Sequence, residues 1–244
     1  MTRDRHLCCV CLMRTSICLG VLLLLGLTVF LPARDEKQRQ NYHDWKPLFD
    51  GKKNQFRGYK LFDFPKRSWR IDDGALRTIP GADAVDLISE ERYDNFELEL
   101  DWMVSPGART GVLYRSTEDD DGPAWFSGPI VSLIDDESHP DAEHFNRTAG
   151  AIYDVAGPRA SKELNPPGQW NQLRLVMRGP QVEHWINGVK VLAYDLTSEQ
   201  FRRLVGRSQF KAVKNFAREP EGHVGLQYSS DVVWFRNVRI RRLP

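Results

Sequence analysis

The chain has 244 residues, 41% of them apolar, and its 34 Lys and Arg nearly balance its 33 Asp and Glu. This composition excludes a disordered chain, a collagen and a protein with several membrane spans. The first 34 residues carry four Arg and one Asp, which leaves 30 basic and 32 acidic residues in the rest. We therefore expect one globular domain that binds no nucleic acid.

The N-terminal segment over residues 1–34 has the pattern of a signal peptide or a membrane anchor. Three Arg residues precede an apolar run over 15–32, and the sequence turns polar directly afterwards. The run is close to the ~20 residues that a spanning helix needs, while the cleavage candidate at Ala33 lacks a small residue at Leu31. Cleavage would give a secreted protein, and retention would give a membrane-anchored one facing the periplasm or the cell exterior. Both alternatives predict export.

Residues 35–44 are predicted to be a charged linker, and residues 45–244 form the predicted exported domain. All four cysteines precede residue 19, so the domain contains none. The sequence therefore excludes a disulfide framework and thiol chemistry in the domain.

Short runs of β-branched and aromatic residues recur from Trp45 onward between clusters of Gly, Pro, Asp and Asn. Their period-two alternation predicts antiparallel strands, most clearly at Phe96–Trp102, where one face is apolar and the other acidic. The predicted strands cover residues 68–71, 75–77, 96–103, 111–114, 131–134, 170–177, 181–186, 189–194, 223–227 and 232–241. This number of strands favours a jelly-roll sandwich of two antiparallel sheets.

Two local signals refine this picture. Asn187-Gly188 between two strands predicts a type I′ hairpin, because both central positions of that turn need a positive φ. One short helix is predicted over 198–205, where Thr197 and Gln200 have the spacing of a capping box. The expected fold class is therefore all-β with one short helix.

Several segments, taken in order, resemble the 3-keto-disaccharide hydrolase family. They are WKPLFDGKK from Trp45, SWRIDDGAL from Ser68, RYDNFELELDW from Arg92, RTGVLYRS from Arg109, GPIVSLIDDESHPDA from Gly128, TAGAIYD from Thr148, PPGQWNQL from Pro166, VEHWINGVKVLAYDL from Val182 and GHVGLQYSSDVVWFRNVRIRRL from Gly222. The resemblance implies a concanavalin A-like sandwich, export, and cleavage of glycosides that are oxidised to a ketone at C3.

The implied chemistry requires particular side chains in the site. A 3-ketone acidifies the hydrogen on C2, so a base can remove it, the enolate can expel the C1 substituent, and water can add back. Such a site needs a general base, a cation or donors for the enolate oxygen, and an acid for the leaving group. His184 in HWING is a candidate base or metal ligand. On an extended strand its side chain shares a face with Val182 and Ile186, so a hydrogen-bonded structural histidine is an equal alternative.

The other catalytic candidates are Asp135 and Arg115. Asp135 and Asp136 follow a strand in an acidic patch that also holds Asp141, and carboxylates so spaced can bind a divalent cation or sugar hydroxyls, or simply cap a turn. Arg115 could place its guanidinium on the keto or enolate oxygen, or pair with an acid in 118–121.

The resemblance and the aromatic character of the loops also indicate substrate contacts. The candidates are Trp125, Tyr153, Asp154 and Asn187, with a carbohydrate as the expected partner. Burial in a sandwich core is the alternative for the aromatic residues.

The chain departs from the family at several positions. Members commonly carry Glu and Gln where Ile130 and Ser132 stand, and Asp-His-Gly where Tyr228, Ser229 and Ser230 stand. Ile130 can neither bind a cation nor move a proton, so a reaction must use other groups. Three hypotheses follow: a 3-keto-glycoside hydrolase or lyase, a non-catalytic carbohydrate-binding module held at the membrane, and a lectin-like structural or interaction domain.

Overall fold

The computed structural model describes residues 44–118, 122–158 and 162–244. The predicted signal or anchor segment over 1–34 and linker residues 35–43 lie outside the described residues. The strands are β1 (Lys46–Phe49), β2 (Phe56–Gly58), β3 (Trp69–Asp72), β4 (Ala75–Thr78), β5 (Leu87–Ser89), β6 (Phe96–Val104), β7 (Arg109–Ser116), β8 (Ile130–Ile134), β9 (Asn171–Arg178), β10 (Gln181–Ile186), β11 (Val189–Asp195), β12 (His223–Leu226) and β13 (Val233–Arg242). The helical elements are α2 (Glu199–Val205) and the short 3-10 helices η1 (Ala124–Phe126), η2 (Pro140–Glu143), η3 (Phe145–Arg147) and η4 (Gln209–Ala212).

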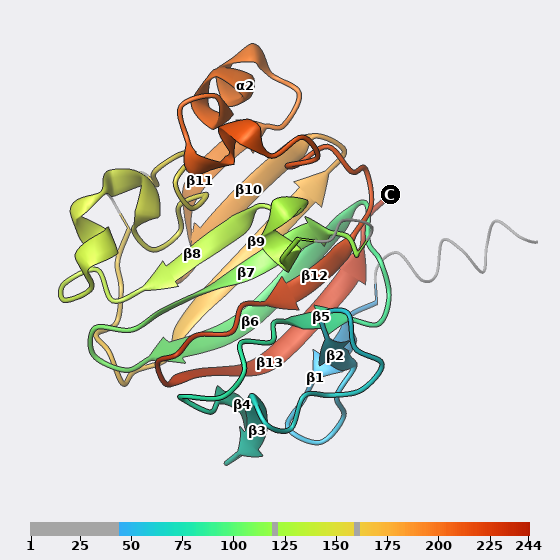
Figure 1. Cartoon of the computed structure of the whole chain (residues 1–244), viewed down its shortest axis with the longest axis vertical. Coiled ribbons are helices and arrows are strands. Elements are labelled where there is room, and N and C mark those ends of the chain that lie inside the picture. Colours follow the sequence, from blue (N-terminus) through green and yellow to red (C-terminus); the bar gives the residue numbers. More distant parts are fainter. Residues whose placement is uncertain (1–43, 119–121, 159–161) are drawn as a thin grey trace, which may run out of the picture. The chain divides into compact units, whose positions relative to one another are not determined.

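The strands form two antiparallel sheets that lie one behind the other in Figure 1. The larger sheet has the order β11-β10-β9-β6-β13-β4-β3, and β1 pairs with β13. The smaller sheet has the order β2-β5-β12-β7-β8. The predicted all-β sandwich of two antiparallel sheets with one short helix is therefore confirmed.

The core lies between the sheets and follows from the alternation of the long strands. In β6 the side chains of Phe96, Leu98 and Leu100 are buried against the smaller sheet. The acidic side chains of the same strand point away from the core. Arginines from β9 and β13 cover them, so that even Glu97 is only 2% exposed. The predicted acidic face is therefore present, and cross-strand ion pairs neutralise it.

The hairpin between β10 and β11 has the predicted turn. Asn187 has a φ of 47° and Gly188 a φ of 81°, as a type I′ turn requires. Helix α2 begins one residue later than the predicted capping box. The N-cap is Ser198, whose Oγ accepts a hydrogen bond from the Phe201 N–H, whereas the Thr197 hydroxyl donates to Asp195. The prediction of Thr197 as the cap was wrong because Asp195 binds its hydroxyl.

The ten predicted strands correspond to β3, β4 and β6 through β13, each within two residues at either end. The alternation pattern did not reveal β1, β2 and β5, which have only three or four residues. In the ranges that the structure describes, no helix is long and apolar enough to cross a membrane. The predicted membrane anchor falls on residues outside those ranges.

Candidate functional site

The structure does not bring the three predicted catalytic residues into one cavity. His184 lies in the core, Asp135 lines a pocket at one end of the sandwich, and Arg115 lines a different cavity. The three positions therefore have to be considered separately.

His184 is fully buried in β10, on the core side together with Val182 and Ile186, as its alternation indicated. Its Nδ1 lies 2.9 Å from the Gly150 carbonyl oxygen, and its Nε2 lies 2.9 Å from the Tyr194 hydroxyl. Burial lowers the pKa of His184 to about 4, even though the hydrogen bond to Gly150 opposes this shift. The imidazole is thus neutral and has both nitrogens occupied, which is the structural role left open above.

Arg115 is the next-to-last residue of β7 and is buried, with 8% exposed. One Nη donates a hydrogen bond to the Gly179 carbonyl oxygen at 2.9 Å. The expected alternative was an ion pair with an acid in 118–121. Glu118 binds the guanidinium of Arg57 and the Lys60 N–H instead, and residues 119–121 lie outside the described residues.

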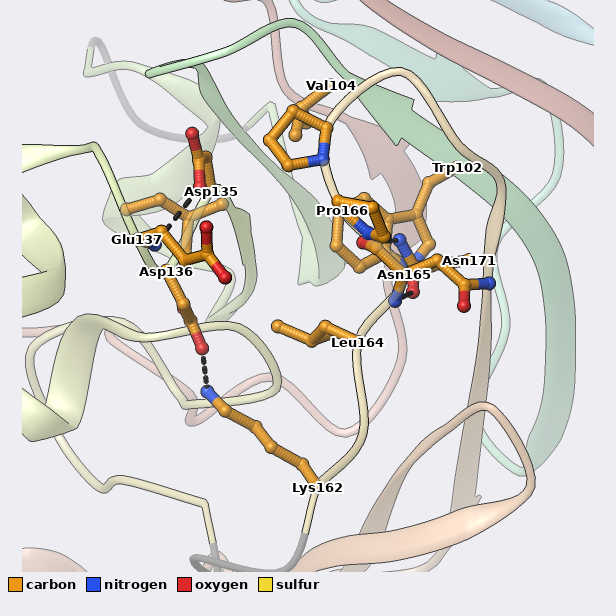
Figure 2. Close-up of a pocket in the computed structure, with 12 residues that line it drawn as sticks. Trp102, Val104, Asp135, Asp136, Glu137, Lys162, Leu164, Asn165, Pro166 and Asn171 are labelled. Carbon is orange, nitrogen blue, oxygen red and sulfur yellow. Dashed lines mark hydrogen bonds and ion pairs between the residues drawn. The ribbon is translucent and has the colours of Figure 1, made fainter.

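The pocket of about 400 Å³ that Asp135 lines is shown in Figure 2. The pocket lies where the ends of β6 and β8 meet the segment that leads into β9, and polar and apolar side chains both line it. Its walls are Trp102, Val104, Ile134, Asp135, Asp136, Glu137, Lys162, Leu164, Asn165, Pro166, Pro167 and Asn171. A volume of this size suits one or two sugar rings.

The carboxylate of Asp135 is hydrogen-bonded to the backbone in the wall of this pocket. Its carboxylate accepts hydrogen bonds from the N–H groups of Gly107 at 2.7 Å and Glu137 at 3.0 Å. Burial raises the pKa of Asp135, but these donors and Ser138 outweigh burial, so its pKa lies below its ordinary value. Asp135 is therefore a turn-forming carboxylate with little capacity to act as a base.

The neighbouring residues offer more reactive groups. Asp136 forms an ion pair with Lys162, drawn as a dashed line in Figure 2, and the same ammonium donates to the Ala149 carbonyl oxygen at 2.9 Å. Burial lowers the pKa of Lys162, and Asp136 opposes that shift. Glu137 is exposed, and its carboxylate has no partner among the described residues. The pocket thus holds a free carboxylate and an ammonium group on one side.

The indole of Trp102 lies in the wall of the same pocket. Trp102 is 1% exposed, and its Nε1 is buried without a hydrogen-bond partner in the described part of the chain. A buried N–H without a partner costs free energy, and a ligand oxygen can remove that cost. Neither Trp102 nor Lys162 was among the predicted site residues. Trp102 was missed because it lies at a core position in the alternation of β6. Lys162 was missed because it lies in a segment with no periodic pattern.

The acidic patch after β8 does not gather into a cation site in the structure. Asp141 pairs with Arg109 at 3.3 Å and Arg147 at 3.1 Å, and Asp136 pairs with Lys162. Within the described ranges, no three His, Cys, Asp or Glu side chains are placed to hold a metal ion. The suggested divalent cation therefore has no ligand set at this patch, because arginine, lysine and backbone N–H groups already bind its carboxylates.

Two of the predicted substrate contacts lie together on the outer face of the smaller sheet. Trp125 and Tyr153 pack against a small apolar cluster made by Leu113, Ala124 and Ile130. The Tyr153 ring lies beneath the guanidinium of Arg109, 5.0 Å from its carbon to the ring centre. We call this surface the aromatic face. Ile130, one of the departures from the family, is 4% exposed and lies in the buried cluster beneath these two rings.

The remaining predicted contacts serve the framework. Asp154 pairs with Arg147 at 2.8 Å and accepts a hydrogen bond from the Gln209 N–H at 2.8 Å. Asn187 donates through its Nδ2 to the Asn171 Oδ1 at 2.8 Å, so it supports Asn171, a residue of the pocket in Figure 2. Both side chains are saturated by neighbours of the protein itself.

A two-sheet jelly roll with a pocket of mixed polar and apolar lining at one end places this protein in a structural class that includes lectins and carbohydrate-active proteins. Residues 44–241 match the family described as the 3-keto-alpha-glucoside-1,2-lyase-like domain. The chain belongs to this family, which confirms the resemblance and the expected class of enzyme, a hydrolase acting on glycosides.

Individual relatives agree with this assignment. A 3-keto-disaccharide hydrolase of Bacteroides thetaiotaomicron is 33% identical over 226 residues, which cover 80% of this chain and 77% of that protein. A crystal structure of a protein described as a glycosyl hydrolase from Parabacteroides distasonis superimposes with a TM-score of 0.75 at 25% identity, over 88% of this chain and 99% of the other. A second from the same species has a TM-score of 0.67 at 27% identity, over 82% of this chain and all of the other.

Proposed function

We propose that this protein hydrolyses 3-keto-glycosides or 3-keto-disaccharides by elimination followed by hydration, in the pocket of Figure 2. The observation that carries the proposal is family membership over 44–241, together with a relative named for 3-keto-disaccharide hydrolysis. The pocket supports it because a free carboxylate, an ammonium group and an unpartnered indole N–H line one space of sugar size.

The carboxylate of Glu137 is the base in this proposal. It takes the proton from C2 of the keto sugar, and the electron pair of that bond passes into the enolate. The enolate then expels the oxygen on C1, which leaves with a proton and forms the free alcohol. Water adds across the C1–C2 double bond, with its oxygen on C1 and a proton on C2. One glycoside and one water thus give one keto sugar and one alcohol.

Lys162 and Trp102 are the groups that stabilise the enolate oxygen. An ammonium has three N–H bonds, and Lys162 uses two of them for Asp136 and Ala149. The third remains for the substrate, and the Trp102 Nε1–H has no other acceptor among the described residues. Donors fixed in a partly dry pocket stabilise developing negative charge more strongly than water does.

The test measures release of the C1 group from 3-keto-trehalose, 3-keto-sucrose and an aryl 3-keto-glucoside, with and without added divalent cations. Glu137→Gln and Lys162→Met are expected to lower kcat by about 100-fold or more, as loss of a general base or an oxyanion donor usually does. Glu143→Gln changes an exposed carboxylate outside the pocket and is the matched control. Full turnover in Glu137→Gln would refute the assignment of the base.

A carbohydrate-binding protein without turnover is the second candidate. The aromatic face supports it, since the partly buried rings of Trp125 and Tyr153 pack against one apolar cluster and aromatic rings can stack on sugar C–H surfaces. This alternative predicts saturable binding of the same sugars, no product, and loss of binding in Trp125→Ala.

We also propose that the protein acts outside the cytoplasm. The support is the Arg-flanked apolar run over 15–32, which predicts either a cleaved signal or a retained anchor. Determination of the N-terminus of the mature protein, together with membrane fractionation, distinguishes the two forms. A cytoplasmic full-length protein would refute export.

A further inference from the structure

A second cavity, of about 530 Å³, lies between the end of β7 and the segment that runs from α2 past η4. It shares no lining residue with the pocket of Figure 2. The phenyl rings of Phe201, Phe210 and Phe216 line it, and all three side chains are buried. The cavity therefore offers an apolar wall to any occupant.

The charged groups of this cavity are all cationic among its described lining residues. They are Arg115, Arg202, Lys211 and Arg218. Arg115 is buried, whereas the other three are exposed. Within the described parts of the chain, none of the four forms an ion pair. A neutral carbohydrate has no charged group that these four cations could bind.

A β-bulge turns Arg115 towards this cavity. Ser116 pairs with His223 and Leu113 with Gly225, so Tyr114 and Arg115 both lie opposite one residue of β12. Arg115 has a φ of 54°, which is the left-handed region. A non-glycine residue held in this conformation inside a strand is strained, and such strain concentrates at functional positions.

The guanidinium of Arg115 lacks the partners that a buried cation normally has. Its one hydrogen bond goes to the Gly179 carbonyl oxygen, and its Nε is buried without a partner in the described residues. A buried charge is costly unless an opposite charge or a full set of hydrogen bonds compensates it. A planar guanidinium binds carboxylates and phosphates through two parallel hydrogen bonds.

We propose that this cavity binds a small organic oxyanion, whose charged group meets Arg115 and whose apolar body packs against the three phenylalanines. The exposed cations at Arg202, Lys211 and Arg218 attract such a ligand over a distance of several ångströms. The site is independent of the proposed reaction in the pocket of Figure 2, because the two cavities have no residue in common.

The test is isothermal titration calorimetry of the full-length protein in detergent with benzoate and with phenyl phosphate. Benzyl alcohol, which has the same ring without the charge, is the neutral control. We expect one of the two anions, or both, to bind with a 1:1 stoichiometry, and we expect added NaCl to weaken binding. The comparison of the two anions shows whether a carboxylate or a phosphate fits Arg115 better.

Variants show whether the binding occurs in this cavity. Arg115→Gln keeps donor groups but removes the charge, and it is expected to lower affinity by about tenfold or more. Arg203→Gln is the control. It removes an exposed cation of helix α2 that does not line the cavity, and it should leave affinity unchanged. If Arg115→Gln does not fold, as judged by near-ultraviolet circular dichroism, the double variant Lys211→Glu/Arg218→Glu replaces it and should weaken binding at the surface.

Three results would overturn the proposal: no binding of either anion, equal binding of benzyl alcohol, or unchanged affinity in a folded Arg115→Gln. In the event that Arg115→Gln is unfolded, unchanged affinity in Lys211→Glu/Arg218→Glu would overturn it. Measured turnover of keto-glycosides in Lys211→Glu/Arg218→Glu separates this site from the proposed active site, since a loss of anion binding there should leave kcat unchanged.

Discussion

The buried His184 makes stability depend on pH in a way that can be calculated. The pKa of this histidine is about 4 in the folded protein, against an ordinary value of 6.5. Between these two values the unfolded chain binds a proton that the folded protein does not. Folding stability therefore falls as the pH drops from 6.5 to 4, by about 1.4 kcal/mol per pH unit and about 3 kcal/mol in total.

A second buried group acts in the opposite direction over part of this range. Burial raises the pKa of Asp86 to about 6, although the hydrogen bond from the Tyr228 N–H opposes this. The folded protein then binds a proton that the unfolded chain releases between pH 3.8 and 6, so this group destabilises the fold as the pH rises. The effect of His184 must therefore be taken as a difference between two proteins that both contain Asp86.

The measurement is urea unfolding of the wild-type protein and of His184→Gln from pH 4 to 7.5. At pH 7.5 the wild type should be more stable by about 1–2 kcal/mol, because glutamine cannot replace both hydrogen bonds of the imidazole. Towards pH 4 this difference should fall by about 3 kcal/mol and change sign, since the variant lacks the imidazole that the unfolded wild-type chain protonates over this range. Parallel stability curves for the two proteins would refute the assignment of a buried neutral imidazole.

Three further predictions concern the framework. Glu97→Gln should lower the free energy of unfolding by about 3 kcal/mol, because it leaves Arg174 and Arg241 without their buried counter-ion; Glu99→Gln, with a partner that is half exposed, should cost under about 1 kcal/mol in the same urea titration. Ser198→Ala should cost about 1 kcal/mol through loss of the helix cap, and a larger loss in Thr197→Ala would contradict the observed cap. Gly188→Ala should lower the melting temperature, by an amount that corresponds to about 1 kcal/mol, because its φ of 81° strains any other residue; an unchanged melting temperature would show that the turn can adopt another conformation.

The sequence predicted the architecture well where strands are long enough for their alternation to be visible. Phe96–Val104 and Gln181–Ile186 show buried and outward positions that match the period of two. The same alternation placed His184 on the core side. Three short strands, β1, β2 and β5, were missed, since alternation over three or four positions does not differ from chance, although β3, β4 and β12 are about as short and were predicted.

The candidate site was less predictable because it depends on contacts between distant segments. Asp135 was found from its place after a strand, but only the fold shows that Gly107 and Glu137 occupy its carboxylate. Lys162 reaches Asp136 from a segment far along the chain, and no local pattern records such a contact. The inward turn of Arg115 could not be predicted either, because a bulge with a non-glycine residue has no signature in the sequence.

The bulge in β7 has a consequence for how proteins of this fold can vary in length. Removal of one residue from a regular strand moves every following side chain to the opposite face. At the bulge, removal of Arg115 would instead restore regular pairing, with Leu113 still opposite Gly225 and Ser116 still opposite His223. A single-codon deletion there would preserve both sheets and the pocket of Figure 2 while it removed the buried cation. The sandwich and the cationic cavity can therefore be gained and lost independently in evolution.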